Sequence, residues 1–492
     1  MDYVVHTVEF LQPYAELVTP FDFSFLYSYV DKLSTSLNLG SDQLRYVLCL
    51  FAAYPLAVVY KFLPSAHLKH LMDVIVGISI AQFVLGSGWI HSFIASFITY
   101  LLVMFGPPKH TPSIVFLFNM LYMSASHIYR LYVDYMGWTL DFTGPQMLLV
   151  IKLTSFAYNY YDGVVDKTFE KKSGHMSSSM KKVYENRQKL AIQEIPSLLA
   201  FYGYVYSFTT FLAGPAFEIR EYLDVTTGKK FRFDGKNKQP SSVLAAFSKF
   251  LVGSLLMAAF AVYGPTYPLS NLHDPKVAAL PLLYQIRDLY ITLIFCKAKY
   301  YAAWKIAEGA TVLCGFGFEG FNKDGSSLGW NGVSNMDILG FEFAQSIRAA
   351  SRAWNKGTQN WLERYVYTRT GNSLIATYFV SAFWHGFYPG YYLFFMSLPL
   401  ATAVNRLAFK RLRPRFIEAD GSFGAKKKVY DFLSYLLTLF AMHYFVMPFQ
   451  AMSWENSLTS LKNTYFVGHI AAVVLYVVLS VIPTPKPKKK IE

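Results

Sequence analysis

Long apolar runs recur along the chain, and their lengths constrain the fold more than any other feature of the sequence. An upright helix needs about 20 apolar residues to cross a bilayer, and shorter runs cross when they tilt or when aromatic ends extend them. The candidate membrane segments are residues 47–62, 71–85, 93–105, 114–132, 147–160, 195–212, 243–263, 280–296, 391–404, 432–446 and 466–482. These runs predict an all-α polytopic membrane protein, preceded by a short interfacial segment at residues 23–30.

Charge is scarce and unevenly distributed along the chain. Only 15% of the residues are charged and 53% are hydrophobic, whereas a soluble domain is typically about 45–50% apolar. The net charge of +14 comes largely from loops at residues 162–194, 229–238 and 406–428. Such loops indicate a cytosolic side that faces anionic lipid, and they argue against a nucleic-acid partner. A single span at residues 195–212 would place the first two basic loops on opposite sides of the membrane. Either this segment is therefore re-entrant, or one loop departs from the rule that basic loops face the cytosol.

The remaining reactive residues show no pattern of a metal site or a covalent nucleophile. No Gly-x-Ser-x-Gly elbow, His-Glu-x-x-His pair or phosphate-binding glycine loop occurs, which favours direct proton transfer as the chemistry. The three cysteines, which we expect to be buried thiols, are Cys49, Cys296 and Cys314. We interpret Asp73, His127 and Arg130, which lie inside or at the ends of early apolar runs, as interfacial side chains, with a functional role as the alternative.

One histidine, His385, lies inside an apolar run that extends over residues 374–400. An ionisable group at membrane depth is costly and is usually retained for function. Imidazole titrates near neutral pH, so His385 can take and return a proton. Pro389 and Gly390 follow within about one helical turn and are expected to break the helix just past the histidine. The alternative is a structural histidine between packed helices, and the residues alone leave both open.

Residues 343–367 predict an amphipathic helix beside the bilayer. Its apolar face combines Ile347, Trp354, Trp361, Leu362 and Tyr365, and its polar face carries Arg348, Arg352 and Lys356. The helix is expected to be interrupted at Gly357. Upstream, Lys297 and Lys299 end an apolar run and precede aromatic residues, a pattern also typical of an interfacial belt.

The chain ends in Lys-Lys-Ile-Glu, after a basic tail that starts at residue 483. A terminal dilysine with two residues after it resembles the signal that returns membrane proteins to the endoplasmic reticulum, and this requires a cytosolic tail. We therefore expect a single membrane domain at residues 1–482 and a cytosolic tail at 483–492. A simple juxtamembrane basic anchor is the alternative. No basic region precedes an apolar core at the amino terminus, so no cleavable signal peptide is expected.

Four sequence blocks together resemble the membrane-bound O-acyltransferase family, in its lysophospholipid branch. They are WHGFYPGYY at residues 384–392, WNKGTQNWL at 354–362, GPAFE at 214–218 and KYYAAW at 299–304. The blocks follow the family order, and the resemblance covers nearly the whole chain. It implies a multi-helix bundle of about eleven spans that encloses a substrate tunnel.

The resemblance also implies the site residues. The family's intramembrane histidine and upstream asparagine correspond to His385 and Asn355, with Asn360 as a competing asparagine. Position 297 is lysine where the branch usually has arginine, which argues against a bidentate contact there. Further substrate-binding candidates are Arg352, Trp354, Lys356, Trp384, Tyr388, Tyr300, Tyr301, Trp304 and Glu218.

The function implied is transfer of a long unsaturated acyl chain from acyl-CoA, as co-substrate, to the sn-2 hydroxyl of a lysophospholipid. Lysophosphatidylcholine is the expected acceptor, with lysophosphatidylserine and lysophosphatidylethanolamine used less well. No permanently bound cofactor or metal is expected, and a homodimer is one option for the assembly. The alternatives are acylation of a peptide or protein within the same family, and a lipid transporter or scramblase.

Overall fold

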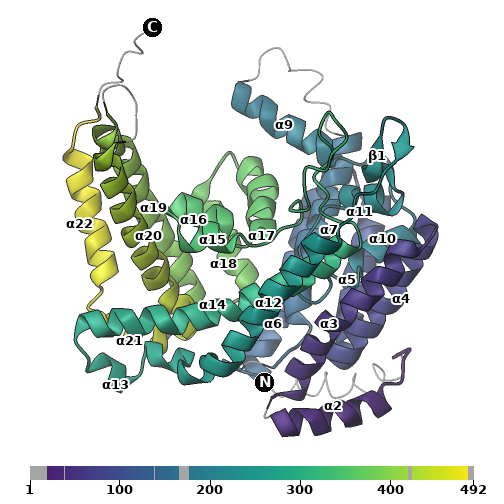
Figure 1. Ribbon diagram of the computed structural model, residues 1–492, viewed down its shortest axis with the longest axis horizontal. Coiled ribbons are helices and arrows are strands. Elements are labelled where there is room, and N and C mark those ends of the chain that lie inside the picture. The colour runs from purple at the N-terminus through teal and green to yellow at the C-terminus, as the bar shows by residue number, and fades with distance from the viewer. Residues whose placement is uncertain (1–18, 38, 138, 166–176, 419–423, 486–492) are drawn as a thin grey trace. The chain divides into compact units, whose positions relative to one another are not determined.

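The computed structural model describes residues 19–37, 39–137, 139–165, 177–418 and 424–485, and they fall into two compact units (Figure 1). The first unit comprises the described parts of Met1–Leu255 together with Ala302–Asn335. The second comprises Leu256–Tyr301 and the described parts of Met336–Glu492. Two long helices, α12 (Val243–Tyr263) and α14 (Leu282–Leu313), contribute residues to both units. The dilysine tail and the amino terminus lie outside the described residues.

The first unit is built from helices and one short hairpin. Its elements are α2 (Ser24–Leu37), α3 (Ser41–Phe62), α4 (Ala66–Leu85), α5 (Trp89–Phe105), α6 (Thr111–Val133), α7 (Thr143–Val164), α9 (Ser178–Leu190), α10 (Leu198–Val205), α11 (Ile219–Thr226) and the antiparallel strands β1 (Arg232–Phe233) and β2 (Lys236–Asn237). Its core is rich in aromatic rings, and Phe217 stacks on Phe316 with ring centroids 4.6 Å apart. Residues 315–337 follow α14 without a long helix.

Asp73 of α4 is buried in this core. The sequence predicts an interfacial position for it instead. It is 1% exposed. The hydroxyl of Tyr60 donates to its Oδ2 atom at 3.1 Å, and that of Tyr222 donates to the same atom at 3.0 Å. The interfacial interpretation of Asp73 is therefore wrong, because two phenols supply the hydrogen bonds that lipid headgroups or water would otherwise give.

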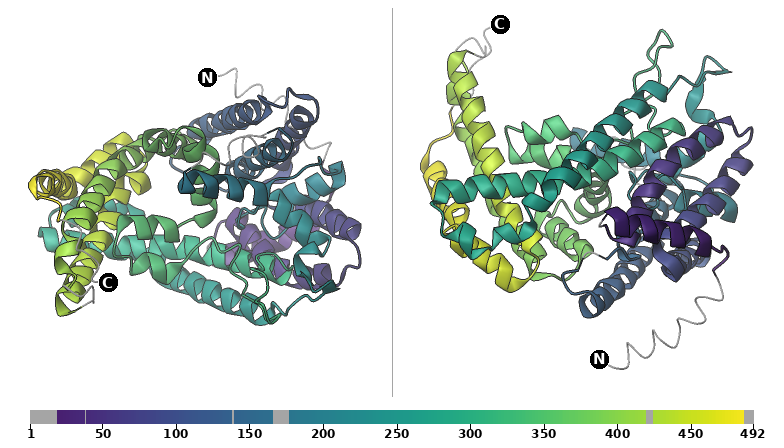
Figure 2. Two further views of the ribbon diagram at one scale, coloured as in Figure 1. Left: turned by 90° about the horizontal axis from the view of Figure 1, so that it is seen from above. Right: turned by 60° about the horizontal axis from the view of Figure 1, so that its bottom comes forward.

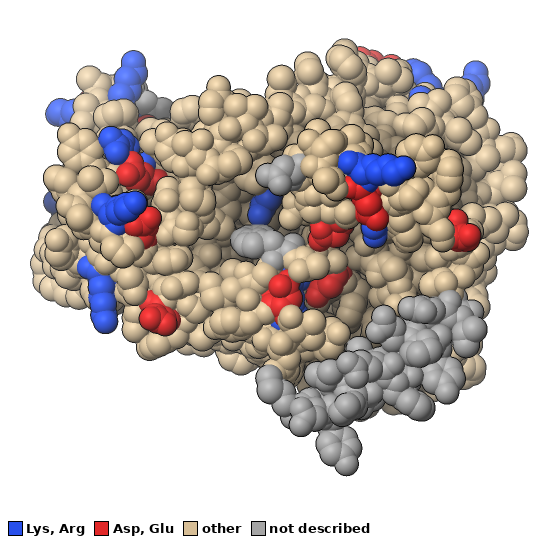
Figure 3. Space-filling model, turned by 90° about the horizontal axis from the view of Figure 1, so that it is seen from below, with Lys and Arg blue, Asp and Glu red and all other residues tan. Residues whose placement is uncertain are grey.

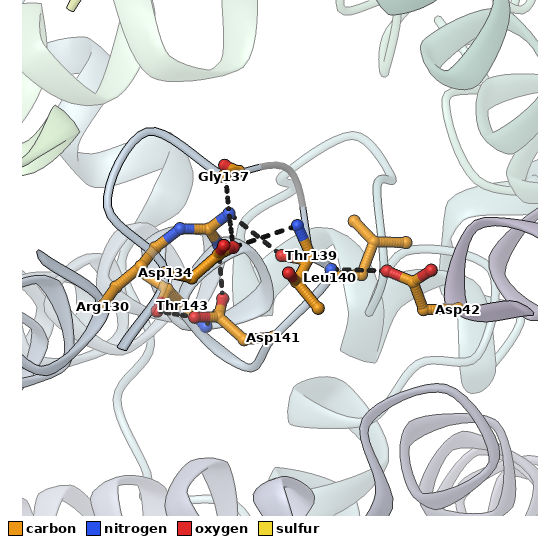
Figure 4. Close-up of polar contacts among 8 residues, drawn as sticks. All are labelled: Asp42, Arg130, Asp134, Gly137, Thr139, Leu140, Asp141 and Thr143. Atoms are coloured by element: carbon orange, nitrogen blue, oxygen red, sulfur yellow. Dashed lines mark hydrogen bonds and ion pairs between the residues drawn. The ribbon is translucent and has the colours of Figure 1, made fainter. Parts of the chain in front are cut away.

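Arg130, another residue expected at an interface, organises the connection between α6 and α7 (Figure 4). Its guanidinium donates to a carboxylate oxygen of Asp141 at 2.9 Å and to the carbonyl oxygen of Thr139 at 3.0 Å. The same loop is tied to the start of α3, because the backbone N–H of Leu140 donates to Asp42 at 2.7 Å. The arginine thus acts as a loop anchor within the first unit.

Among the described residues, five stretches are long and apolar enough to cross a membrane, by length and composition. They are Ser41–Phe62, Ala66–Phe105, Val243–Thr266, Pro389–Arg411 and Ala425–Ala451, and a sixth results if Trp454–Asn463 and Val467–Val481, bent by 69°, count as one span. The helices α6, α7 and α14 are of similar or greater length and are not among these. Figure 3 shows a face on which charged atoms form small groups in a largely uncharged surface. The chain is a multi-pass membrane protein, and the figure of about eleven spans and the enclosed tunnel stay predictions.

The segment at residues 195–212 does not form a full helical span. Its helix, α10, has 8 residues, a length of about 12 Å against the roughly 30 Å of a hydrocarbon core. Six residues of α10, from Ala200 to Val205, are buried in the first unit. The two basic loops that flank this segment are therefore not forced to opposite sides, which removes the conflict with the charge rule.

The second unit is all helical. Besides its parts of α12 and α14 it holds α13 (Pro275–Ala278), α15 (Ile338–Glu342), α16 (Ile347–Ala353), α17 (Lys356–Trp361), a π-helical turn (Leu362–Val366), α18 (Leu374–His385), α19 (Pro389–Arg411), α20 (Ala425–Ala451), α21 (Trp454–Asn463) and α22 (Val467–Val481). The long helices α19, α20 and α22 lie side by side (Figures 1 and 2). Their core contains Tyr444, Phe445 and Met447, all nearly inaccessible to solvent. The three cysteines of the chain are buried free thiols, as expected.

Candidate active site

His385 is the last residue of α18, a helix of 12 residues. Such a helix is about 18 Å long and does not cross a bilayer alone. It begins at Ser373, whose hydroxyl caps the backbone N–H of Ala376 at 3.2 Å. It ends because Gly386 adopts φ 121°, a conformation open to glycine, and because Pro389 cannot continue a helix. The break predicted just past the histidine is confirmed, and it places His385 at a helix end between α18 and α19.

The imidazole of His385 is held in one tautomer by its own helix. Its Nδ1 atom lies 2.6 Å from the carbonyl oxygen of Ser381, one turn earlier. A carbonyl oxygen only accepts, so Nδ1 carries the hydrogen of this bond. In the neutral ring Nε2 then has the free electron pair that can accept a proton, which is the state a general base needs.

Aromatic rings from three helices surround this imidazole. The ring centroids of Trp384, Phe395 and Phe449 lie 4.7, 5.0 and 5.1 Å from that of His385, and the centroid of Tyr391 lies 6.0 Å away. Trp384 comes from α18, Phe395 and Tyr391 from α19, and Phe449 from α20. The packing fixes the plane of the ring and surrounds a polar group with largely apolar neighbours.

Gly390 allows α19 and α20 to approach closely beside this group. A Cβ atom at Gly390 would lie 2.0 Å from the carbonyl oxygen of Pro448. The backbone N–H of Gly390 donates to the carbonyl oxygen of Met452 at 2.8 Å. The Pro-Gly pair of the WHGFYPGYY block therefore does two things: it starts α19, and it presses the start of α19 against the end of α20.

Asn355 forms the turn between α16 and α17. Its backbone is left-handed, with φ 41° and ψ 56°, a region where asparagine is enriched among non-glycine residues. Its side chain makes no capping hydrogen bond to α17, although Asn355 occupies the N-cap position. The interruption expected at Gly357 is wrong by two residues, because Gly357 lies inside α17 and the break is at Asn355. Asn355 is half-buried, whereas the competing Asn360 is exposed.

α17, the helix that follows Asn355, packs against Trp384, the residue that precedes His385. Trp361 ends α17, is 1% exposed, and its ring centroid lies 6.2 Å from that of Trp384. A π-helical turn, a feature frequent at functional sites, follows at Leu362–Val366. His385 and Asn355 thus belong to one compact unit and are joined through this tryptophan pair.

The other predicted site residues divide between the two units. Tyr388 is buried at the N-cap of α19, and its ring centroid lies 5.7 Å from that of Tyr391. Arg352 is exposed at the end of α16, and Lys356 is half-buried at the start of α17. Tyr300 and Tyr301 are in the second unit, and their ring centroids lie 6.4 and 5.8 Å from that of Trp354.

Two predicted residues, Trp304 and Glu218, belong to the first unit instead. Glu218 is the N-cap residue of α11, and its carboxylate accepts a hydrogen bond from the side chain of Asn159 of α7 at 2.8 Å. Glu218 therefore joins two helices of the first unit, whereas His385 and Asn355 lie in the second.

The sequence analysis missed the buried histidine His443 and its partners. His443 of α20 is 5% exposed, and its Nδ1 atom lies 2.7 Å from the carbonyl oxygen of Leu439. Its Nε2 atom accepts a hydrogen bond from the ammonium of Lys297 at 3.0 Å. That ammonium also binds the carboxylate of Glu342. The interfacial-belt reading of Lys297 is wrong, since the residue is 9% exposed. His443 was detectable by the argument used for His385, because it lies in the apolar run 432–446.

Comparison with known proteins identifies a family match that includes His385 and Asn355. The sequence pattern of the MBOAT, membrane-bound O-acyltransferase family matches residues 127–447. The chain is 32% identical to a protein named lysophospholipid acyltransferase from Schizosaccharomyces pombe, over 91% of this chain and 88% of that protein. It is 30% identical to the human protein named membrane-bound glycerophospholipid O-acyltransferase 2, over 93% and 88% of the two chains. A lysophospholipid acyltransferase 1 from Arabidopsis thaliana is 28% identical over 94% and 99%.

Proposed function

We propose that this chain, which belongs to the membrane-bound O-acyltransferase family, acylates lysophospholipids by direct transfer from acyl-CoA. The relatives named as lysophospholipid acyltransferases align over nine-tenths of this chain, which supports the acceptor class. The single observation that supports the chemistry most strongly is the contact between His385 and Ser381. It leaves Nε2 of the candidate histidine as the nitrogen that can take a proton.

The proposed reaction needs one base and no covalent enzyme intermediate. A lysophospholipid hydroxyl is too weak an acid to ionise by itself near neutral pH. As its oxygen attacks the thioester carbonyl, Nε2 of His385 takes the hydroxyl proton. The tetrahedral intermediate collapses, the carbon–sulfur bond breaks, and the CoA thiolate leaves and recovers the proton from the imidazolium. General-base catalysis of this kind contributes about 100- to 10,000-fold to the rate.

Asn355 is the proposed partner of this base. Its side-chain amide is not used to cap α17, so the helix start does not depend on it. The amide can hold the attacking hydroxyl or donate to the oxyanion of the tetrahedral intermediate. A well-placed donor of that kind stabilises the transition state by about 2.7–4 kcal/mol.

The proposed acceptor is lysophosphatidylcholine, with the serine and ethanolamine lysolipids used less well. A choline head has no net charge and is bound best by aromatic faces. The second unit supplies such rings in the sequence blocks that resemble the family, including Tyr300, Tyr301, Trp354 and Tyr388. Transfer of long unsaturated chains and residence in the endoplasmic reticulum belong to the same proposal.

The test is a reconstituted assay with defined lipids. Purified protein in liposomes is given oleoyl-CoA and equal amounts of five lysolipids: the choline, serine, ethanolamine and inositol forms and lysophosphatidic acid. Products are measured by mass spectrometry, and the His385→Ala protein is the control. The proposal expects phosphatidylcholine that carries the oleoyl chain as the main product of the wild type, and no such product from His385→Ala. A higher kcat/KM for lysophosphatidylinositol or lysophosphatidic acid contradicts the choline preference. Movement of lysolipid across the liposome without acylation contradicts the reaction.

A further inference from the structure

A largely buried polar cluster joins three helices of the second unit beside Trp354, the residue before Asn355. We define the Glu342 cluster as Glu342 at the end of α15, Lys297 and Tyr301 of α14, and His443 of α20. Lys297 and Tyr301 are four residues apart, so both point from one face of α14. The proposed function uses the ring of Tyr301 as a contact for the choline head, and it assigns no role to Glu342, Lys297 or His443.

The carboxylate of Glu342 is the centre of this cluster. Its Oε1 atom accepts from the ammonium of Lys297 at 2.6 Å and from the hydroxyl of Tyr301 at 2.7 Å. Its Oε2 atom accepts from the same ammonium at 2.9 Å. The third partner of Lys297 is Nε2 of His443, at 3.0 Å. Such a largely buried pair is costly to break, because removing one partner leaves the other charge without compensation.

Trp354 packs on the outside of this cluster. Its ring centroid lies 5.0 Å from that of Phe341, the residue before Glu342, and 5.8 Å from that of Tyr301. The ammonium of Lys297 lies 5.2 Å from the centroid of Phe341. Two of the rings that contact Trp354, those of Tyr301 and Phe341, are therefore themselves held by the carboxylate and its ammonium partner.

The backbone before Asn355 is tied to the same place. The N–H of Asp337, at the start of α15, donates to the carbonyl oxygen of Ala353 at 3.0 Å. The next two residues are Trp354 and the left-handed Asn355. A left-handed backbone at a residue other than glycine persists only where the surroundings hold it. Here those surroundings are α15, the ring of Trp354 and the Glu342 cluster beneath them.

We propose that Glu342 is a positioning residue for the acyl transfer: its bonds to Lys297 and Tyr301 hold Trp354, and through it the left-handed turn that aims Asn355. The inference rests on the proposed function, because it assigns the turn a role in that reaction. A purely structural ion pair is the competing explanation. It would lower stability and activity together, whatever side chain stands at residue 355.

The test is a double-mutant cycle on full-length protein in liposomes, with oleoyl-CoA and lysophosphatidylcholine. The variants are Glu342→Gln, Asn355→Ala and the double variant, and kcat and KM for oleoyl-CoA are measured for each. If Glu342 acts through Asn355, Glu342→Gln lowers kcat about tenfold, since small misplacement of a reacting group is costly, and leaves KM within about twofold. In the Asn355→Ala background the same change then lowers kcat by less than about twofold, because coupled residues are non-additive.

The matched control is Asp431→Asn, which breaks the ion pair between Lys427 and Asp431 of α20 in the same unit. It is expected to leave kcat within about twofold of the wild type, as for a site that is not coupled to Asn355. Should Glu342→Gln fail to give folded protein, Tyr301→Phe removes a single hydrogen bond to the carboxylate. It should lower kcat about threefold, the equivalent of a modest hydrogen bond, and lose that effect in Asn355→Ala.

Two results overturn the inference in different ways. Equal loss of kcat from Glu342→Gln in both backgrounds shows a structural ion pair, while the proposed function stands. Wild-type turnover in Asn355→Ala would show that the reaction does not need the Asn355 amide. That result refutes the inference together with the proposed role of that amide. A wild-type protein that does not acylate lysolipids refutes the proposed function itself.

Discussion

The Nδ1 atom of His385 and the carbonyl oxygen of Ser381 lie 2.6 Å apart, within a single turn of α18. The same contact occurs in α20, where Nδ1 of His443 lies 2.7 Å from the carbonyl oxygen of Leu439. At the other nitrogen, Nε2 of His443 is bound to the ammonium of Lys297. The two histidines therefore share one tautomer, and in His443 an ammonium 3.0 Å away holds the nitrogen that would act as base.

The contact between His443 and Lys297 predicts unequal effects when each histidine is replaced by glutamine. In His443→Gln the new amide oxygen can still accept from Lys297, so kcat should fall by no more than about tenfold. In His385→Gln no base remains, and kcat should fall by at least about 100-fold. Both are measured by acyl transfer with the purified proteins, and thermal unfolding checks that each is folded. A larger loss in His443→Gln would show that the base was assigned to the wrong histidine.

Asn355 can be separated from its backbone conformation by two substitutions. Glycine adopts the left-handed turn readily, so Asn355→Gly keeps the turn and removes the amide. Both Asn355→Gly and Asn355→Ala should lower kcat at least about tenfold, the low end for loss of one oxyanion donor, with acyl-CoA binding retained. Asn360→Ala, on the exposed face of α17, is the control and should stay within about twofold. Full activity in Asn355→Gly would mean that the turn matters and the amide does not.

The close approach of α19 to α20 gives a prediction at Gly390. An added methyl would lie 2.0 Å from the carbonyl oxygen of Pro448, so Gly390→Ala must push the two helices apart. We expect a loss of about 1–3 kcal/mol in the free energy of unfolding, as for an overpacked core, and a fall in kcat as the rings around His385 shift. The control is Gly144→Ala in α7, where a Cβ atom meets nothing within 4 Å. Equal stability of the two variants would contradict this packing.

The dilysine prediction concerns the carboxyl-terminal tail. Changing Lys489 and Lys490 to serine should let a tagged protein move from the endoplasmic reticulum toward the Golgi, while acyl transfer in isolated membranes stays unchanged. Fluorescence microscopy with compartment markers measures the shift. Unchanged localisation would mean that these lysines serve as a membrane anchor only.

Features set by local chemistry were predictable from the sequence. The run at residues 243–263 coincides with α12 (Val243–Tyr263), and the break after His385 follows from Gly386 and Pro389. Both features depend only on residues that are close in the sequence. The helix depends on the hydropathy of one continuous run, and the break depends on the conformational limits of glycine and proline. The amphipathic pattern from Ile347 onward likewise predicted the burial of Ile347, Trp361, Leu362 and Tyr365, whereas Trp354 is half-buried.

Features set by distant contacts were not predictable. The break at Asn355 depends on Trp354 packing against rings from α14 and α15, so Gly357 was the better guess from propensity alone. The pairing of Lys297 with Glu342 joins residues 45 positions apart. The apolar run at 195–212 reads as a span by composition, although only 8 of its residues form a helix. In each case tertiary contacts override the local signal.

The central claim, that His385 is the base of a lysophospholipid acyl transfer, is tested most directly by the turnover of purified His385→Ala. The assay uses oleoyl-CoA and lysophosphatidylcholine in liposomes, and thermal unfolding is measured on the same sample. The account predicts a protein that unfolds near the wild-type temperature and has lost at least about 100-fold in kcat, the low end for a general base. A folded His385→Ala protein with near wild-type turnover would contradict it.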